Sequence, residues 1–117
     1  MIQFYSYKNC STCQKTRKAL LKNGADFEEI CIIDNPPDKA LLERILKSGT
    51  YTLKQLFNRS GQLYREMNMK EKVDKLPQAE LLNILTSHGK LVKRPIVVKG
   101  DKYLVGYDER MINQLCV

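Results

Sequence analysis

The chain has 117 residues, 43% of them hydrophobic, four cysteines and one histidine. This composition is sufficient for one globular domain, residues 1–117, with a hydrophobic core that does not require disulfide bonds for stability. The net charge of +7 attracts oxyanions, acidic protein surfaces or nucleic acid, and the charge alone does not identify which of them is the partner. No stretch has the ~18 apolar residues of a membrane span and the N-terminus lacks a signal pattern, so we expect a cytoplasmic protein outside the membrane.

The first part of the chain predicts a β-α-β unit. Residues 2–5 read as a short apolar strand, and the helix after the first two cysteines ends at Asn23-Gly24, because glycine readily adopts the left-handed conformation of a helix end. The apolar, β-branched run 27–34 has the length of a second strand. We expect the two strands to be parallel, largely buried and joined by a right-handed crossover.

The middle of the chain, about residues 36–90, is predicted to be a helical insertion. Apolar residues at helical spacing, a capping aspartate and a helix-opening proline mark its elements. The expected elements are a helix from Asp38 to Ser48, a short turn at 53–57, a polar helical or irregular stretch at 62–76 and a helix from Pro77 to His88.

The last part of the chain predicts a hairpin and a helix. Residues 94–106 read as two β-runs joined by a Gly-Asp turn, and Asp108 begins a terminal helix that runs through Leu115. The order strand-helix-strand, helical insertion, strand-strand-helix predicts an α/β fold with one mixed four-stranded sheet flanked by helices.

A Cys-x-x-Cys pair, Cys10 and Cys13, stands at the start of the first helix. Unpaired backbone N–H groups and the positive end of the helix dipole lower the pKa of a thiol at this place, and Lys8, Lys15 and Arg17 add positive charge. Cys10 precedes the helix and should be the more exposed sulfur. We therefore predict that Cys10 is the nucleophile and Cys13 the resolving thiol that releases a covalent adduct.

Two other interpretations of this pair remain open. Both cysteines can serve as core residues, or they can supply two of the four ligands of a zinc site. The other candidate zinc ligands, Cys31, His88 and Cys116, are scattered along the chain, so we predict no metal site and no bound cofactor. Cys31 lies between apolar neighbours and is expected to be a small core residue.

Arg94-Pro95 is the second informative motif. Proline at the head of a central strand cannot donate to the sheet, and a cis bond costs little before proline, so we expect this bond to be cis. Beside the Cys10 loop, Pro95 would shape a cleft in which Arg94 binds a carboxylate or a tetrahedral oxyanion. Arg59 is a further candidate for the anion side of the cleft. The alternative is that Arg94 is an exposed arginine near the start of a strand.

In their order, these motifs resemble the ArsC/Spx family. The resemblance runs from residue 2 to about 115 and implies a thioredoxin-like fold with a helical insertion after the second strand. The motifs that carry it are Cys10-x-x-Cys13 after a first strand, Asn35-Pro36-Pro37, Leu56-Phe57-Asn58, Lys93-Arg94-Pro95-Ile96-Val97 and Val105-Gly106-Tyr107-Asp108-Glu109.

The two branches of this family imply different functions. Its arsenate reductases use the cysteine that matches Cys10 to attack arsenate, hold the anion with three arginines, and pass the oxidation to glutathione and glutaredoxin. Only Arg94 matches those arginines, whereas Asn58 and Gly106 fall at the other two positions. Its Spx-type regulators keep both cysteines as a disulfide switch and bind the C-terminal domain of the RNA polymerase α-subunit. The whole chain looks most like a third group of short family members with Cys-x-x-Cys.

The resemblance and the cysteine pair together predict a cytoplasmic thiol-disulfide oxidoreductase of arsenate-reductase type, with glutathione or glutaredoxin as its reductant. The alternative is a redox-sensing regulator of Spx type that binds RNA polymerase. Direct binding of nucleic acid is a third option, but the chain lacks an aromatic-basic recognition motif, so we expect none.

Overall fold

The computed structural model describes all 117 residues, and their contacts divide the chain into two compact units. The first unit comprises Met1–Cys31 and Arg94–Val117, and the second comprises Ile32–Lys93. That the whole chain is a single domain stays a prediction. Neither unit contains a helix with the length and hydrophobicity required to cross a membrane.

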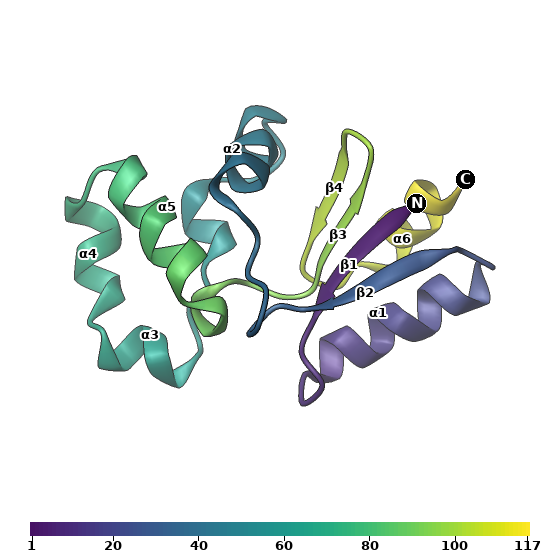
Figure 1. Cartoon of the computed structure of the whole chain (residues 1–117), viewed down its shortest axis with the longest axis horizontal. Helices are drawn as coiled ribbons and strands as arrows, with labels where there is room; N and C mark the ends of the chain where they lie inside the picture. The colour runs from purple at the N-terminus through teal and green to yellow at the C-terminus, as the bar shows by residue number, and fades with distance from the viewer. The chain divides into compact units, whose positions relative to one another are not determined.

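The first unit is built on a four-stranded sheet with the strand order β2-β1-β3-β4 (Figure 1). β1 pairs in parallel with β2, whereas β3 lies antiparallel to both β1 and β4. The sheet is therefore mixed, as predicted, and β1 and β3 are its central strands. The strands are β1 (Ile2–Ser6), β2 (Phe27–Cys31), β3 (Ile96–Lys99) and β4 (Lys102–Val105).

Two helices, α1 (Ser11–Lys22) and α6 (Glu109–Cys116), contact each other and share one core with the sheet. Asp108 caps α6 as predicted, and its carboxylate accepts a hydrogen bond from the backbone N–H of Met111 at 3.1 Å. The order β-α-β, then β-β-α, gives the predicted thioredoxin-like fold. Its core contains Ile2, Phe4, Cys13, Ala19, Leu20, Val97, Leu104, Ile112 and Leu115.

The second strand differs from its prediction. β2 ends at Cys31 instead of Asp34, and it lies at the edge of the sheet with Glu28 and Glu29 exposed. The expectation of two largely buried strands is therefore wrong for β2, because a strand with one neighbour keeps an open edge. Cys31 is exposed at the end of this strand, so its predicted place in the core is also wrong.

The second unit contains the predicted helical insertion between β2 and β3. Asp38 caps its first helix as predicted, because its carboxylate accepts a hydrogen bond from the backbone N–H of Leu41 at 2.8 Å. The polar stretch 62–76 forms two short helices, separated at Asn68, whose backbone is left-handed with φ 54°. The elements are α2 (Lys39–Lys47), η1 (Leu53–Leu56), α3 (Gln62–Glu66), α4 (Met69–Lys75), α5 (Gln78–Ser87) and η2 (Gly89–Leu91).

Gly89 marks a close backbone approach within the second unit. A Cβ atom at Gly89 would lie 2.1 Å from the carbonyl oxygen of Ile32, which only glycine avoids. The preceding helix, α5, begins after Pro77 and ends before His88, as predicted. This glycine therefore lets the chain leaving α5 lie directly against the segment that follows β2.

Candidate active site

Cys10 and Cys13 lie where β1 passes into α1. The turn between the two elements is closed by a hydrogen bond from the backbone N–H of Cys10 to the carbonyl oxygen of Tyr7 at 3.0 Å. Cys10 is the N-cap residue of α1, with an extended backbone (φ −104°, ψ 116°), and Cys13 lies in the first helical turn. The predicted order of strand, turn and helix around the cysteines is confirmed.

The two sulfurs have different surroundings. Cys10 is partly exposed, whereas Cys13 is fully buried in the core of the first unit, with 0% exposure. Burial, followed by the contact with the Cys10 side chain and its charge, raises the pKa of Cys13 to about 12. Cys13 is therefore a protonated thiol at neutral pH and can act as a donor toward its neighbour.

The pKa of Cys10 is shifted in the opposite direction, below that of an ordinary thiol. Burial by itself raises the pKa of Cys10, but the Cys13 thiol, the Thr12 hydroxyl, the backbone N–H of Cys13 and the charge of Arg94 outweigh it and hold the pKa below that of an ordinary thiol. The Thr12 contact is direct, since Oγ1 lies 3.0 Å from the sulfur of Cys10. The direction agrees with the position of Cys10 at a helix N-terminus.

Arg94 is the cation that acts on this pair. The bond between Arg94 and Pro95 is cis, as predicted, and Pro95 is buried, with its carbonyl accepting from the N–H of Gly106 at 2.8 Å. The Arg94 guanidinium carbon lies 5.0 Å from the centre of the Tyr7 ring, and Nη1 is buried without a hydrogen-bond partner. A buried donor without a partner is costly, so this nitrogen is suited to an anionic ligand.

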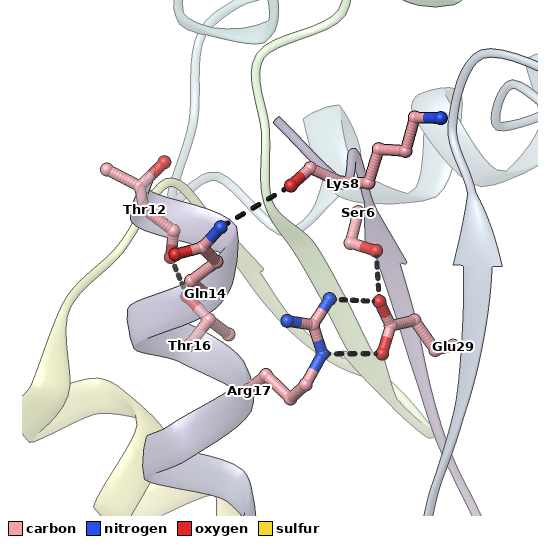
Figure 2. A network of polar contacts seen from close by, with 7 residues as sticks. All are labelled: Ser6, Lys8, Thr12, Gln14, Thr16, Arg17 and Glu29. Atoms are coloured by element: carbon pink, nitrogen blue, oxygen red, sulfur yellow. Dashed lines mark hydrogen bonds and ion pairs between the residues drawn. The ribbon is translucent and has the colours of Figure 1, made fainter. Parts of the chain in front are cut away.

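Two of the other predicted cations have partners elsewhere. Arg17 donates two hydrogen bonds to the carboxylate of Glu29 on β2, which also accepts from the Ser6 hydroxyl at 2.7 Å (Figure 2). Lys15 lies over the ring of Tyr107, with Nζ 5.9 Å from the ring centre. The Arg17 charge therefore ties α1 to β2 and is balanced by Glu29.

Further hydrogen bonds hold the start of α1. The Thr16 hydroxyl donates to the carbonyl of Thr12 at 2.8 Å, and the Gln14 amide donates to the carbonyl of Lys8 at 3.4 Å (Figure 2). The polar residues near the cysteines that the sequence did not predict are Ser6, Thr12, Thr16 and Glu29. The position of Thr12 between Cys10 and Cys13 was the one available signal for it.

The remaining predicted site residue, Arg59, belongs to the second unit. It is exposed in the loop that precedes α3, and its part in anion binding stays a prediction. The structure brings Cys10, Cys13 and Arg94 together within the first unit. No three His, Cys, Asp or Glu side chains gather into a cluster that could hold a metal ion, and the absence of a metal also stays a prediction.

Comparison with known proteins gives matches over most of the chain. Residues 5–115 match the model of the ArsC family. The chain is 41% identical to the uncharacterized protein YusI of Bacillus subtilis (strain 168), over 92% of each protein. It is 28% identical to the global transcriptional regulator Spx 2 of Oceanobacillus iheyensis, over 91% of this chain and 77% of the relative. A solved structure, a possible arsenate reductase from Streptococcus mutans UA159, is 40% identical, with a TM-score of 0.85, over 92% of this chain and 91% of its own.

We predict that Thr12→Val raises the pKa of Cys10, because valine keeps the shape of threonine but lacks the hydroxyl that contacts the sulfur. A hydrogen bond to a charged group contributes roughly 1.5–3 kcal/mol, which corresponds to a rise of about one pKa unit or more. The ultraviolet absorbance of the thiolate against pH measures this in a variant without Cys31 and Cys116. Thr12→Ser keeps the hydroxyl and should titrate like the parent. Equal titration of the valine and serine variants would contradict the role of Thr12.

We also predict that the pair of Arg17 and Glu29 makes stability depend on pH. The hydrogen bond from Arg17, and then that from Ser6, hold the pKa of Glu29 below its ordinary value despite partial burial. A carboxyl whose pKa is lowered by folding stabilises the fold above its unfolded pKa, and this contribution is lost as the pH falls through the folded pKa. Urea unfolding between neutral and acidic pH should show a smaller loss for Glu29→Gln than for the parent. The exposed Glu28→Gln is the matched control and should follow the parent.

Proposed function

The chain belongs to the ArsC family, and on this premise we propose that it is a thiol-disulfide oxidoreductase of arsenate-reductase type, acting in the cytoplasm. In this proposal Cys10 is the nucleophile and Cys13 the resolving thiol. The observation that carries it is the opposite displacement of their pKa values, lowered at the partly exposed Cys10 and raised to about 12 at the buried Cys13. One sulfur is thus ready to attack while its neighbour stays protonated.

The order of the two steps follows from this difference. The Cys10 thiolate attacks one sulfur of a disulfide substrate, the substrate S–S bond breaks, and one substrate thiolate leaves. Cys10 then carries no negative charge, so one cause of the raised pKa of Cys13 is gone. Cys13 loses its proton and attacks the Cys10 sulfur, which releases the second substrate thiol. The pair ends as a disulfide, and two electrons have passed to the substrate.

The same pair can reduce arsenate. The Cys10 sulfur forms a bond to arsenic with loss of water, and attack by Cys13 on that sulfur breaks the S–As bond and leaves its electron pair on arsenic. The products are arsenite and the disulfide between the two cysteines. Two glutathione thiols, or a glutaredoxin, are the proposed reductant that restores the pair.

Arg94 is proposed to orient the anionic or thiol substrate, with Pro95 shaping the turn and Arg59 as a second anion ligand. The buried and unpartnered Nη1 of Arg94 supports this role. The fit to arsenate is limited, because the resemblance matches one of three arginines. At one unmatched position, Gly106, the backbone has φ 86°, which suits glycine and strains other residues. Each missing charge-assisted contact forgoes about 1.5–3 kcal/mol, so a thiol or disulfide substrate is favoured over arsenate.

We predict that Cys13→Ser accumulates a mixed disulfide between Cys10 and glutathione, because Cys10 can still attack but no neighbouring thiol can release the adduct. Intact-protein mass spectrometry after exposure to oxidised glutathione measures it, in a background of Cys31→Ser and Cys116→Ser. The control protein, which keeps Cys10 and Cys13 and carries only Cys31→Ser and Cys116→Ser, should release glutathione and form the disulfide between Cys10 and Cys13. Cys10→Ser should form little adduct, and an equal yield from Cys10→Ser and Cys13→Ser would reject the assigned nucleophile. Arsenate reduction with glutathione and glutaredoxin that is unchanged in Cys10→Ser would reject it too.

The second candidate function is that of a redox-sensing regulator of Spx type. The 28% identity to Spx 2, and a cysteine pair that can change state, favour it. On this alternative proposal the chain binds the C-terminal domain of the RNA polymerase α-subunit in one redox state. A pull-down with that domain should then retain the reduced or the oxidised chain, and the variant Cys10→Ser/Cys13→Ser should not respond to oxidant. Failure of both redox states to bind would contradict this function.

A further inference from the structure

We propose that the exposed side of α1 is a docking surface for an acidic protein that exchanges electrons with Cys10. This inference rests on the proposed oxidoreductase function. The surface consists of Lys15, Lys18, Leu21 and Lys22 on α1, with Tyr107 against Lys15, and is called the basic face below.

The geometry of α1 gathers these side chains on one side of the helix. Lys15, Lys18 and Lys22 are spaced by three and four residues, which places them in a row within about 60° around the helix axis. All three are exposed, whereas the buried residues of α1 are Cys13, Thr16, Ala19 and Leu20. The row spans about 10 Å along a helix whose N-cap is Cys10 (Figure 1). The row begins at Lys15, five residues and about 7.5 Å of helix axis after Cys10, so a partner on the row must extend past the start of α1 to reach the Cys10 sulfur.

The charge of the basic face is not balanced within the molecule. The ion pairs of the structure join Arg17 to Glu29 and Lys54 to Asp74, and none includes a lysine of the basic face. α1 contains no Asp or Glu, and no acidic residue stands in its first turn. Like charges three or four residues apart weaken a helix, and cations early in a helix oppose its dipole. Lys22 stands in the last turn, where the helix dipole favours a cation, so helix stability accounts for Lys22 but not for Lys15 and Lys18.

Two large apolar side chains lie among these charges. Away from the chain ends, Leu21 (61% exposed) and Tyr107 (36% exposed) are the exposed large hydrophobic residues of the protein. Tyr107 is in contact with Lys15, whose Nζ is 5.9 Å from the ring centre. Leu21 is exposed about one turn after Lys18 and lies at the border of the lysine row, since it points about 100° away from its neighbour Lys22. Apolar anchors within a polar, charged rim are typical of protein interfaces.

The chemistry of the site favours a protein partner over nucleic acid. The exposed cations of this face are lysines, while the one arginine of α1, Arg17, is engaged by Glu29, and arginine is the residue that binds phosphate in a bidentate manner. The partner of Cys10 must also contain sulfur. The Cys10 thiolate breaks the disulfide of the partner, and Cys13 then releases the partner as a dithiol while the chain keeps the disulfide. Acidic residues around the partner's disulfide speed the encounter.

Binding without chemistry is the first test. Three fluorescent peptides of equal length carry a central serine flanked by Glu, Gln or Lys, and their anisotropy with the full chain is measured at low and high salt. The Glu peptide should bind about tenfold tighter than the Lys peptide at low salt, and high salt should remove most of this difference. Lys18→Glu should weaken binding of the Glu peptide about fivefold. Lys102→Glu, the same charge change at an exposed lysine of β4, should change it less than twofold.

The apolar part of the face has its own signature. Leu21→Ser should weaken binding of the Glu peptide several-fold at low and at high salt alike, because salt does not screen apolar contact. Equal losses from Lys18→Glu and Lys102→Glu would show that net charge alone acts, and would overturn the inference. So would a short single-stranded DNA that displaces the Glu peptide and binds more tightly.

The second test adds the chemistry. This test uses the background of Cys31→Ser and Cys116→Ser, which removes the free thiols outside the pair. The same peptides, with the central serine replaced by a cysteine blocked as a 2-pyridyl disulfide, then release the coloured pyridinethione when Cys10 attacks. The rate constants should follow the binding order, with Glu above Gln above Lys, and Lys18→Glu should reduce that preference. Equal rates for the three peptides overturn the docking surface. If no peptide releases pyridinethione but the Glu peptide still binds more tightly than the Lys peptide, the oxidoreductase function is overturned. The basic face then remains a binding site for acidic proteins.

Discussion

The structure around the cysteines depends on the boundary at which β1 becomes α1. This boundary leaves Cys10 at the N-cap, partly in solvent, and places Cys13 one turn further on, inside the core. The same helix start that favours a negative sulfur on Cys10 drives Cys13 into a region where a negative sulfur is costly. Two chemically identical side chains, three residues apart, thereby acquire pKa values shifted in opposite directions.

The rest of the first unit serves to hold that boundary in place. The Arg17–Glu29 pair and the Ser6 hydroxyl join α1 to the edge strand β2. The α6 helix contacts α1 from within the same core. Immediately before the central strand β3, the Arg94-Pro95 turn contributes the cation that lowers the pKa of Cys10. The environment of the Cys10 sulfur thus depends on strands, helices and a turn from both ends of the chain.

The charges of α1 divide into two groups with different uses. Arg17 faces the sheet, is balanced by Glu29 and contributes to the fold. Lys15, Lys18 and Lys22 face solvent without acidic partners, and two exposed apolar side chains lie among them. A helix with an apolar inner side and a cationic outer side can both anchor Cys13 and attract an acidic partner toward Cys10.

Local patterns in the sequence were enough to predict the element order, the mixed sheet, the Asp38 and Asp108 caps and the cis bond before Pro95, because each depends on local periodicity or on a short motif. They also located the cysteine pair at a helix start. The position of β2 at the edge of the sheet, which exposes Cys31, became visible with the folded chain. The same is true of the pair of Arg17 and Glu29 and of the buried Arg94 nitrogen without a partner. These outcomes depend on contacts between residues far apart in the chain, which spacing within one segment does not encode.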